Sequence, residues 1–168
     1  MCFIDMADQD RLYLENSQMK ITKAVKALII DAQGRYLLQL RDNIPRITFP
    51  AYWCLFGGAL KGLETPINGI KRELYEELGY KPTFIEQFLS YKYSIKRVNI
   101  IDREVTIFAS LIDSYEIEKL VLREGQSLAF FNILELQKEN NVVPLDLSTV
   151  LMHGLSGTAP SLFNINHS

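Results

Sequence analysis

Three glutamates, Glu73, Glu76 and Glu77, stand at spacings that bring carboxylates together on a helix. Side chains three and four positions apart neighbour one another on an α-helix, so these acids would share one patch. Such a patch is self-repelling unless a cation neutralises it, and hard divalent ions such as Mg²⁺ take oxygen ligands and commonly hold substrate phosphates as well. The spacing therefore indicates a cation site. For E-x-x-E-E alone, an ordinary solvated face of a helix is the commoner explanation.

The helix that carries these acids has recognisable ends. Thr65 is a good N-cap, and Pro66 suits the first helical position, where a missing N–H costs nothing. Gly79 marks the end of the helix, and Pro82 follows just beyond it. Between these ends the apolar residues form one stripe, with the glutamates on its flank: Ile67, Ile70, Leu74 and Leu78. The helix can therefore pack against a core and still present its acids.

Two neighbouring features favour chemistry over a solvated face. Arg72 stands beside the acids, where it can screen them or orient Glu64 through a charge-assisted hydrogen bond. The pair Gly57 and Gly58 precedes Glu64, and paired glycines allow a tight turn and a close approach of the backbone. A backbone carbonyl at this turn can then face a metal.

Together these residues resemble the Nudix box, G-x5-E-x7-R-E-U-x-E-E-x-G-U, in which U is a bulky apolar residue. The residues that match it are Gly58, Glu64, Arg72, Glu73, Leu74, Glu76, Glu77 and Gly79. Tyr80 stands where an aliphatic residue is usual, and Phe56 where a proline often precedes the glycines. Neither departure removes a ligand. A weaker resemblance extends over residues 20–155.

The resemblance implies a fold, an activity and a ligand set. The fold is an α/β/α sandwich with a mixed sheet, and the reaction is metal-dependent hydrolysis of a diphosphate linkage in a nucleoside diphosphate derivative. Glu73, Glu76, Glu77 and the Gly57 carbonyl are implied as ligands of Mg²⁺ or Mn²⁺. The pair of Glu64 and Arg72 is implied to brace the loop and helix around the ligands. Such residues hold geometry more than they react.

Beyond the box, Glu124 is the strongest candidate. It lies in an E-G-Q segment before a predicted strand, and this placement resembles mutator-type nucleotide pyrophosphatases, where the matching glutamate contributes to metal binding or water activation. An acidic turn residue is the alternative. Arg41 ends a predicted strand, where an arginine of those relatives contacts substrate phosphate. Asp146 is implied near a base pocket by analogy. Three aromatics could stack on a base or pack in the core: Phe49, Tyr52 and Trp53.

The chain outside the helix reads as strands interleaved with a few helices. A hairpin is expected over residues 21–30 and 36–40, a loop over 42–52, and short strands over 53–56 and 59–60. Further strands are expected over residues 83–97, 103–112 and 127–131, and helices over 9–18, 133–138 and 145–155. The tail after residue 157 is small and polar. This order suits an α/β fold.

Composition limits the function classes. The 168 residues and 48% hydrophobic content fit a single domain, and a net charge of −2 gives no general attraction to polynucleotides or membranes. Only Cys2 and Cys54 are present, so we expect a reducing, cytoplasmic compartment, with Cys54 buried rather than nucleophilic. The N-terminus lacks the basic region of a signal peptide. We expect no membrane partner, and the resemblance leaves a homodimer open.

The choice of substrate class is limited only by sequence patterns of known subgroups that this chain lacks. The patterns of ADP-ribose, NADH and coenzyme A hydrolases are absent or incomplete, which leaves (deoxy)nucleoside triphosphates and nucleotide sugars ahead, with a slight preference for triphosphates. Two non-enzymatic alternatives stand beside hydrolysis. One is a nucleotide-sensing module that keeps the fold without turnover, and the other is an interaction domain with a solvated acidic helix. The intact charged positions of the box argue against both.

Overall fold

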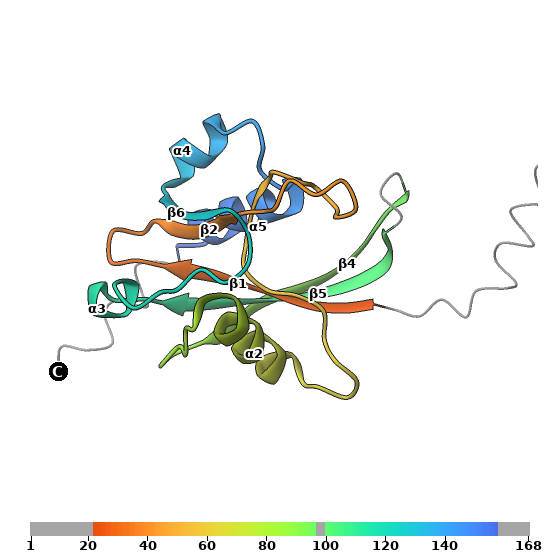
Figure 1. Cartoon of the computed structure of the whole chain (residues 1–168), viewed down its shortest axis with the longest axis horizontal. Helices are drawn as coiled ribbons and strands as arrows, with labels where there is room; N and C mark the ends of the chain where they lie inside the picture. The colour runs from red at the N-terminus through yellow and green to blue at the C-terminus, as the bar shows by residue number, and fades with distance from the viewer. Residues whose placement is uncertain (1–21, 97–99, 158–168) are drawn as a thin grey trace, which may run out of the picture.

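The computed structural model describes residues 22–96 and 100–157, which form a six-stranded mixed sheet flanked by helices (Figure 1). The sheet order is β3-β2-β1-β5-β4, and β6 pairs with β2. The strands are β1 (Thr22–Ile30), β2 (Tyr36–Leu40), β3 (Trp53–Cys54), β4 (Glu86–Ile95), β5 (Ile100–Leu111) and β6 (Ser127–Phe131). The helices are α2 (Pro66–Leu78), α3 (Ser114–Ile117), α4 (Ile133–Lys138) and α5 (Pro144–Leu155).

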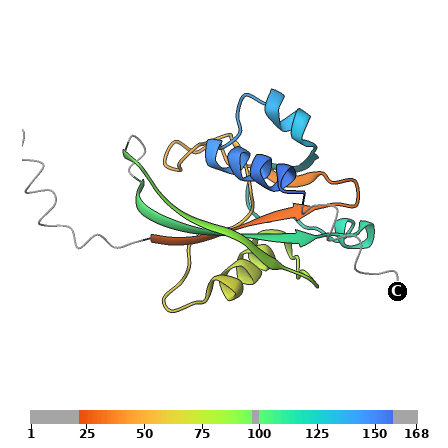
Figure 2. The same cartoon turned by 180° about the vertical axis from the view of Figure 1, so that it is seen from behind.

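The sheet lies between two helical layers. Helix α2 covers one face, and α4 and α5 cover the other, as the two opposite views show (Figures 1 and 2). Strand β1 serves both layers because successive side chains of a strand point to opposite faces. Its Leu28 and Ile30 pack in the cluster beneath α4 and α5, whereas Val25 and Ile29 pack beneath α2. The expected α/β/α sandwich with a mixed sheet is confirmed.

The expected hairpin is present, but its strands pair only at their turn. Ile29 and Ile30 of β1 pair with Leu37 and Tyr36 of β2, whereas the full length of β1 runs parallel to β5. The segment after β3 then returns to β1 through bridges at Phe56 and Ala59. These bridges seat the two glycines of the predicted turn directly against β1.

Other boundaries shift modestly from the expectations. Strand β5 begins at Ile100 rather than at residue 103, and β3 contains only Trp53 and Cys54 of the expected 53–56. The short helix α3 was not expected, although Asp113 and Glu116 form a capping box at its start. The expected helix over residues 9–18 and the tail after 157 lie outside the described residues. Within the described ranges, none of the helices combines the length and apolar character needed to cross a membrane.

Candidate active site

Helix α2 begins and ends where its sequence predicts. The Thr65 side chain accepts a hydrogen bond from the Asn68 N–H, Pro66 occupies the first turn, and Gly79 ends the helix in the left-handed conformation at φ 66°. Its apolar stripe anchors it to the sheet, because Ile70 and Leu74 are fully buried. The flank of the helix is thus held at a fixed position beside the glycine turn.

Arg72 is the centre of the ion-pair network on this flank. Its guanidinium donates to both Glu64 oxygens, at 2.9 and 2.8 Å, to Glu73 at 2.7 Å and to Glu76 at 3.0 Å. A further bond reaches the Ala59 carbonyl at 3.2 Å. The Arg72 bonds lower the pKa of Glu64 to about 2, and the Lys61 N–H adds to this effect. Arg72 therefore ties the loop before the helix to the helix itself.

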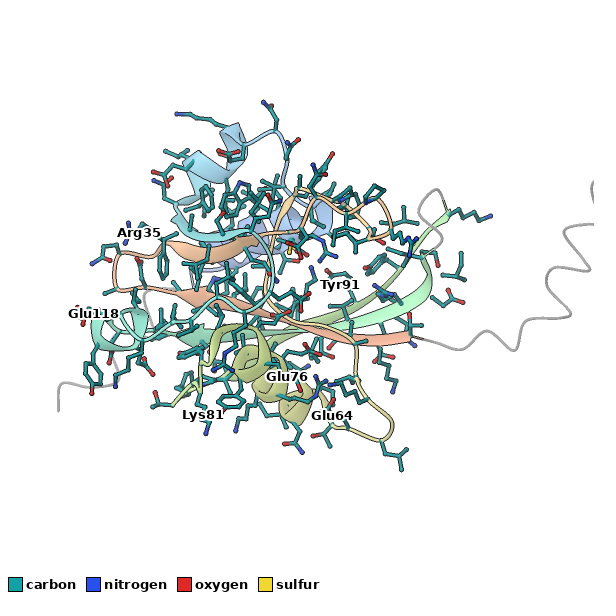
Figure 3. All side chains as sticks on the ribbon, in the orientation of Figure 1. Arg35, Glu64, Glu76, Lys81, Tyr91 and Glu118 are labelled. Atoms are coloured by element: carbon teal, nitrogen blue, oxygen red, sulfur yellow. The ribbon has the colours of Figure 1, made fainter. Side chains whose placement is uncertain are left out.

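The three glutamates of the box have different surroundings. Glu77 is buried, Glu73 lines the cavity described below, and the Glu76 side chain is 48% exposed. Besides Arg72, Glu76 pairs with the Lys61 ammonium at 3.3 Å and is absent from the cavity wall. Figure 3 shows Glu76 and Glu64 close together beside α2. The structure thus brings Glu73 and Glu77 to one cavity and leaves Glu76 out of the cavity wall.

The two glycines make room for these acids. A Cβ on Gly57 would lie 2.1 Å from the Val25 carbonyl oxygen, and its φ of 129° also favours glycine. A Cβ on Gly58 would lie 2.7 Å from the Glu73 carboxylate. The Gly57 N–H donates to Glu77 at 3.0 Å. The turn and the helix are therefore in direct contact, and no side chain separates them.

Glu77 is an acid in an environment that disfavours its charge. Burial raises its pKa to about 8, and the nearby charges of Glu124 and Glu73 act in the same direction. Hydrogen bonds from the Gly57 N–H and from the Gln39 side chain only partly oppose this rise. None of the ion pairs among the described residues involves Glu77. A cation placed among these acids would relieve the unfavourable charge.

A single cavity of about 450 Å³ brings together several of the predicted site residues, but its wall does not include Glu64, Arg72 or Glu76. Its wall includes Gly57, Glu73, Glu77, Glu124 and Arg41, which come from four separate segments of the chain. The Nε of Arg41 is buried, and it is the one such side-chain atom of the described residues without a hydrogen-bond partner. Acidic and cationic side chains thus line the same cavity.

The cavity wall also contains Lys26, Tyr91 and Tyr93, which the sequence did not single out, and Asp146, which the resemblance implied near a base pocket. Lys26 forms an ion pair with the buried Asp146, and Asp146 also accepts a hydrogen bond from the Leu55 N–H at 2.9 Å. Tyr91 and Tyr93 line the same wall, and Tyr91 lies on the other side of the sheet from α2 (Figure 3). Lys26 stands among the apolar residues of β1, and this unusual position was the feature of the sequence that could have revealed it.

The other residues that the sequence suggested lie either in the cavity wall or in the hydrophobic core. Phe49 lines the cavity and its ring lies 5.5 Å from that of Tyr52. Trp53 instead packs edge-on against Phe131, with ring centroids 4.8 Å apart, so it belongs to the core. Cys54 is buried as a free thiol, as expected.

The donors of the cavity suit a hard divalent cation by their chemistry. Glu73, Glu77 and Glu124 offer only oxygen, which Mg²⁺ and Mn²⁺ prefer. Residues 22–96 and 100–157 contain no three carboxylate, imidazole or thiolate groups already converged as a ligand set. In the structure Glu73 accepts a hydrogen bond from Arg72 and Glu77 accepts one from the Gly57 N–H. The donors therefore fit such an ion by their chemistry.

A glycine turn, an acid-bearing helix and a cationic wall around one cavity are typical of enzymes that cleave phosphoric anhydrides. The sequence supports the same class, because the family model of the NUDIX domain matches residues 20–147. The chain therefore belongs to the Nudix family and is a Nudix-type pyrophosphohydrolase. Enzymes of this family generally use divalent metals. No curated protein matches the chain.

Solved structures share this fold at low sequence identity. The MutT protein from Methanosarcina mazei Go1 is 19% identical, with a TM-score of 0.68 over 84% of this chain and 99% of that one. A NUDIX hydrolase from Nitrosomonas europaea is 22% identical, with a TM-score of 0.66 over 82% and 90%. The MutT NUDIX hydrolase from Burkholderia pseudomallei is 18% identical, with a TM-score of 0.65 over 79% and 97%. These likenesses concern the fold alone.

Proposed function

We propose that this enzyme hydrolyses a diphosphate linkage in a nucleoside diphosphate derivative with the help of Mg²⁺ or Mn²⁺. The observation that carries the proposal is the shared cavity, whose wall contains the acids Glu73, Glu77 and Glu124 together with Arg41. A diphosphate linkage carries negative charge that repels an attacking water, and its leaving group departs with more charge. Its hydrolysis therefore needs both the acids that bind a cation and the arginine that binds phosphate. The acids would hold the cation and the arginine would bind phosphate oxygens.

The proposed ligands are the carboxylates of Glu73, Glu76, Glu77 and Glu124, together with the Gly57 carbonyl. When bound, the ion supplies charge neutralisation at the phosphate oxygens and an activated water. In the structure the carbonyls on either side of Gly57 accept hydrogen bonds from β1, from Ala27 at Phe56 and from Val25 at Gly58, each at 2.9 Å. This pairing fixes the turn without using the Gly57 carbonyl.

Arg41 is the proposed phosphate-binding residue. Its buried Nε has no partner among the described residues, and a buried donor without a partner costs about 1–3 kcal/mol. Arg41 lines the cavity, where its Nη1 lies 3.9 Å from the Cys54 sulfur, and a guanidinium can bind a phosphate through paired donors once the side chain turns toward it. We expect Arg41→Lys to keep the charge, lose the paired geometry and raise KM about tenfold, the equivalent of roughly 1.4 kcal/mol. An unchanged KM would exclude this role.

The cavity size favours a small nucleotide. Its volume of about 450 Å³ falls within the usual range for small-molecule sites, which is roughly 300–1,000 Å³. The net charge of −2 offers no general attraction to polynucleotides. We propose (deoxy)nucleoside triphosphates first and nucleotide sugars second. The two-cysteine composition, with Cys54 buried as a free thiol, supports the cytoplasm as the compartment.

The test is release of phosphate or pyrophosphate, with and without Mg²⁺. The panel contains canonical and oxidised nucleoside triphosphates, nucleotide sugars, ADP-ribose and dinucleoside polyphosphates. We expect Mg²⁺-dependent turnover with a clear preference for one class, and we expect Glu77→Gln to abolish it in a folded protein. Silence across the panel, with folded protein and metal bound, would refute the proposal and favour a nucleotide-sensing module.

A further inference from the structure

The segment from Val121 to Gln126 is fastened at both of its ends. At its start, the Val121 N–H donates to the Leu78 carbonyl at 3.0 Å, and the Arg123 N–H donates to the Glu77 carbonyl at 2.8 Å. At its end, the Gln126 N–H donates to the Leu40 carbonyl at 2.8 Å. The Gln126 side chain adds a bond to the Arg41 carbonyl at 2.6 Å. The segment thus connects the end of α2 to the end of β2.

The Arg123 side chain strengthens the attachment to α2. Its Nη1 donates to the Tyr75 carbonyl at 2.9 Å, and its guanidinium carbon lies 5.3 Å from the centre of the Tyr75 ring. Helix α2 has no basic residue in its own last turn, where its carbonyls carry partial negative charge. Arg123 supplies that cation from another segment of the chain.

Gly79 leaves room for this approach. A Cβ at Gly79 would lie 3.0 Å from Nη2 of Arg123, which is tighter than nine in ten real Cβ contacts, so the guanidinium would have to shift by a few tenths of an ångström. The glycine that ends α2 therefore has two roles, since it adopts the left-handed conformation and also leaves the space that the guanidinium fills.

Glu124 lies between the two fastened ends. It lines the cavity with Glu73 and Glu77, but its carboxylate has no hydrogen bond or ion pair within the described part of the chain. The backbone alone therefore sets its position. On the other side of Glu124, Gly125 has φ 84°, and a Cβ there would lie 2.8 Å from the Leu40 carbonyl oxygen, so this side is also tightly placed.

We propose that Arg123 is a positioning residue, which holds Glu124 against the acidic side of the cavity by binding the C-terminal end of α2. The proposal rests on the proposed function, because it assigns Glu124 a part in hydrolysis. Arg123 does not line the cavity, so it acts through its neighbour and makes no contact with substrate.

The test is a double-mutant cycle in the full chain, with Arg123→Met, Glu124→Gln and the double variant. We expect Arg123→Met to lower kcat about tenfold, as loss of such supporting residues commonly does, with KM within about twofold. In the Glu124→Gln background the same change should have little further effect. Arg123→Lys should restore part of kcat, because an ammonium also suits the end of a helix.

The control is Lys119→Met, which removes a neighbouring surface cation that lies over the Tyr115 ring and, among the described residues, makes no hydrogen bond or ion pair with α2. We expect its kinetics to match the parent. Equal losses of kcat from Arg123→Met in both backgrounds would show a merely structural role and overturn the proposal. An unchanged kcat in Arg123→Met would overturn it as well.

Amide hydrogen exchange gives a second readout that needs no substrate. We expect the amides of Val121 and Arg123 to exchange faster in Arg123→Met than in the parent or in Lys119→Met, while those of β1 stay unchanged. Unaltered exchange at these amides would overturn the claim that Arg123 holds the segment. A parent without turnover would instead refute the proposed function and the kinetic part, and exchange would still decide whether Arg123 holds the segment.

Discussion

The Arg72 guanidinium binds the Glu64 carboxylate through two hydrogen bonds, from Nε at 2.9 Å and from Nη2 at 2.8 Å. Paired bonds of this kind fix both distance and orientation. They join the loop before α2 to the middle of the helix, and the remaining Nη1 donates to Glu73 at 2.7 Å and to Glu76 at 3.0 Å. One side chain therefore orients the loop and two of the acids together.

Replacing Arg72 by lysine tests this arrangement. An ammonium keeps the charge but cannot bind Glu64 at two oxygens while also reaching Glu73. We expect kcat/KM to fall by about 10- to 100-fold, as for other residues that orient metal ligands. Steady-state kinetics at saturating Mg²⁺ measures this. Lys71→Arg, on the exposed neighbouring position, is the control and should keep parental activity. A fully active Arg72→Lys variant would contradict the orienting role.

Glu77 predicts how the stability of the metal-free protein depends on pH. Its pKa is about 8 in the folded state, mainly through burial, against an ordinary value of 4.5. Between these values the folded protein holds a proton that the unfolded chain has lost, so this contribution to stability decreases as pH rises. Glu77→Gln removes it. We therefore expect the variant to gain Tm relative to the parent on going from pH 5 to pH 8, by about 2–4 °C for each kcal/mol.

Thermal unfolding in EDTA at several pH values measures this difference. Glu76→Gln is the matched control, because that side chain is 48% exposed. A Tm difference between Glu77→Gln and the parent that stays constant with pH would contradict the raised pKa.

Gly58 predicts a steric effect on one acid. An alanine Cβ would lie 2.7 Å from the Glu73 carboxylate, so that side chain must move or the turn must shift. We expect Gly58→Ala to lower kcat by at least about tenfold, because a misplacement of 1 Å near a reacting group can cost roughly 100-fold. Gly62→Ala is the control for backbone strain alone, since its φ of 54° disfavours alanine but nothing lies within 4 Å of its Cβ position. Comparable kinetics for both variants would exclude the steric argument.

Lys26 and Asp146 predict a coupled effect on stability. Burial lowers the pKa of Lys26, but the Asp146 carboxylate, helped by Cys54 and Tyr91, acts in the opposite direction and the pKa is raised overall, so the lysine stays charged. Asp146→Asn would leave that charge without its partner, which costs about 3–5 kcal/mol for a buried pair. The Lys26 side chain is 21% exposed, so we expect the lower end of that range.

Urea unfolding measures this cost, and Lys26→Met in the same background should recover part of it. Lys23→Met removes an exposed lysine of the same strand and should change the free energy of unfolding by less than about 0.5 kcal/mol. Additive effects of Asp146→Asn and Lys26→Met would contradict the coupling.

The bounds of α2 could be predicted from the sequence because they depend on short-range interactions. Thr65, Pro66 and Gly79 act within one or two turns of their own positions, so their consequences do not depend on the rest of the chain. The pairing of Arg72 with Glu64 was predicted for the same reason, since both lie on the loop and helix that the box defines. The exposure of Glu76 was not predicted, because helical spacing gives a shared face but not the position of the cavity.

His153 shows the opposite case. The fold buries it and places its Nδ1 2.9 Å from the Tyr36 hydroxyl, 117 positions away. The ion pair of Lys26 with Asp146 spans 120 positions, and a pattern along the chain does not reveal such a partner. The contact of Arg123 with Tyr75 likewise depends on how the chain returns to α2.

The sequence by itself determined the family, the acidic helix and the glycine turn, because caps, helical spacing and the box are all local. The tertiary structure alone decided which groups share a cavity. Glu77, Arg41, Glu124 and Asp146 come from segments that the sheet order brings together, and burial then sets the charge environment of each. Long-range packing fixes these distances, and no spacing in the sequence encodes them.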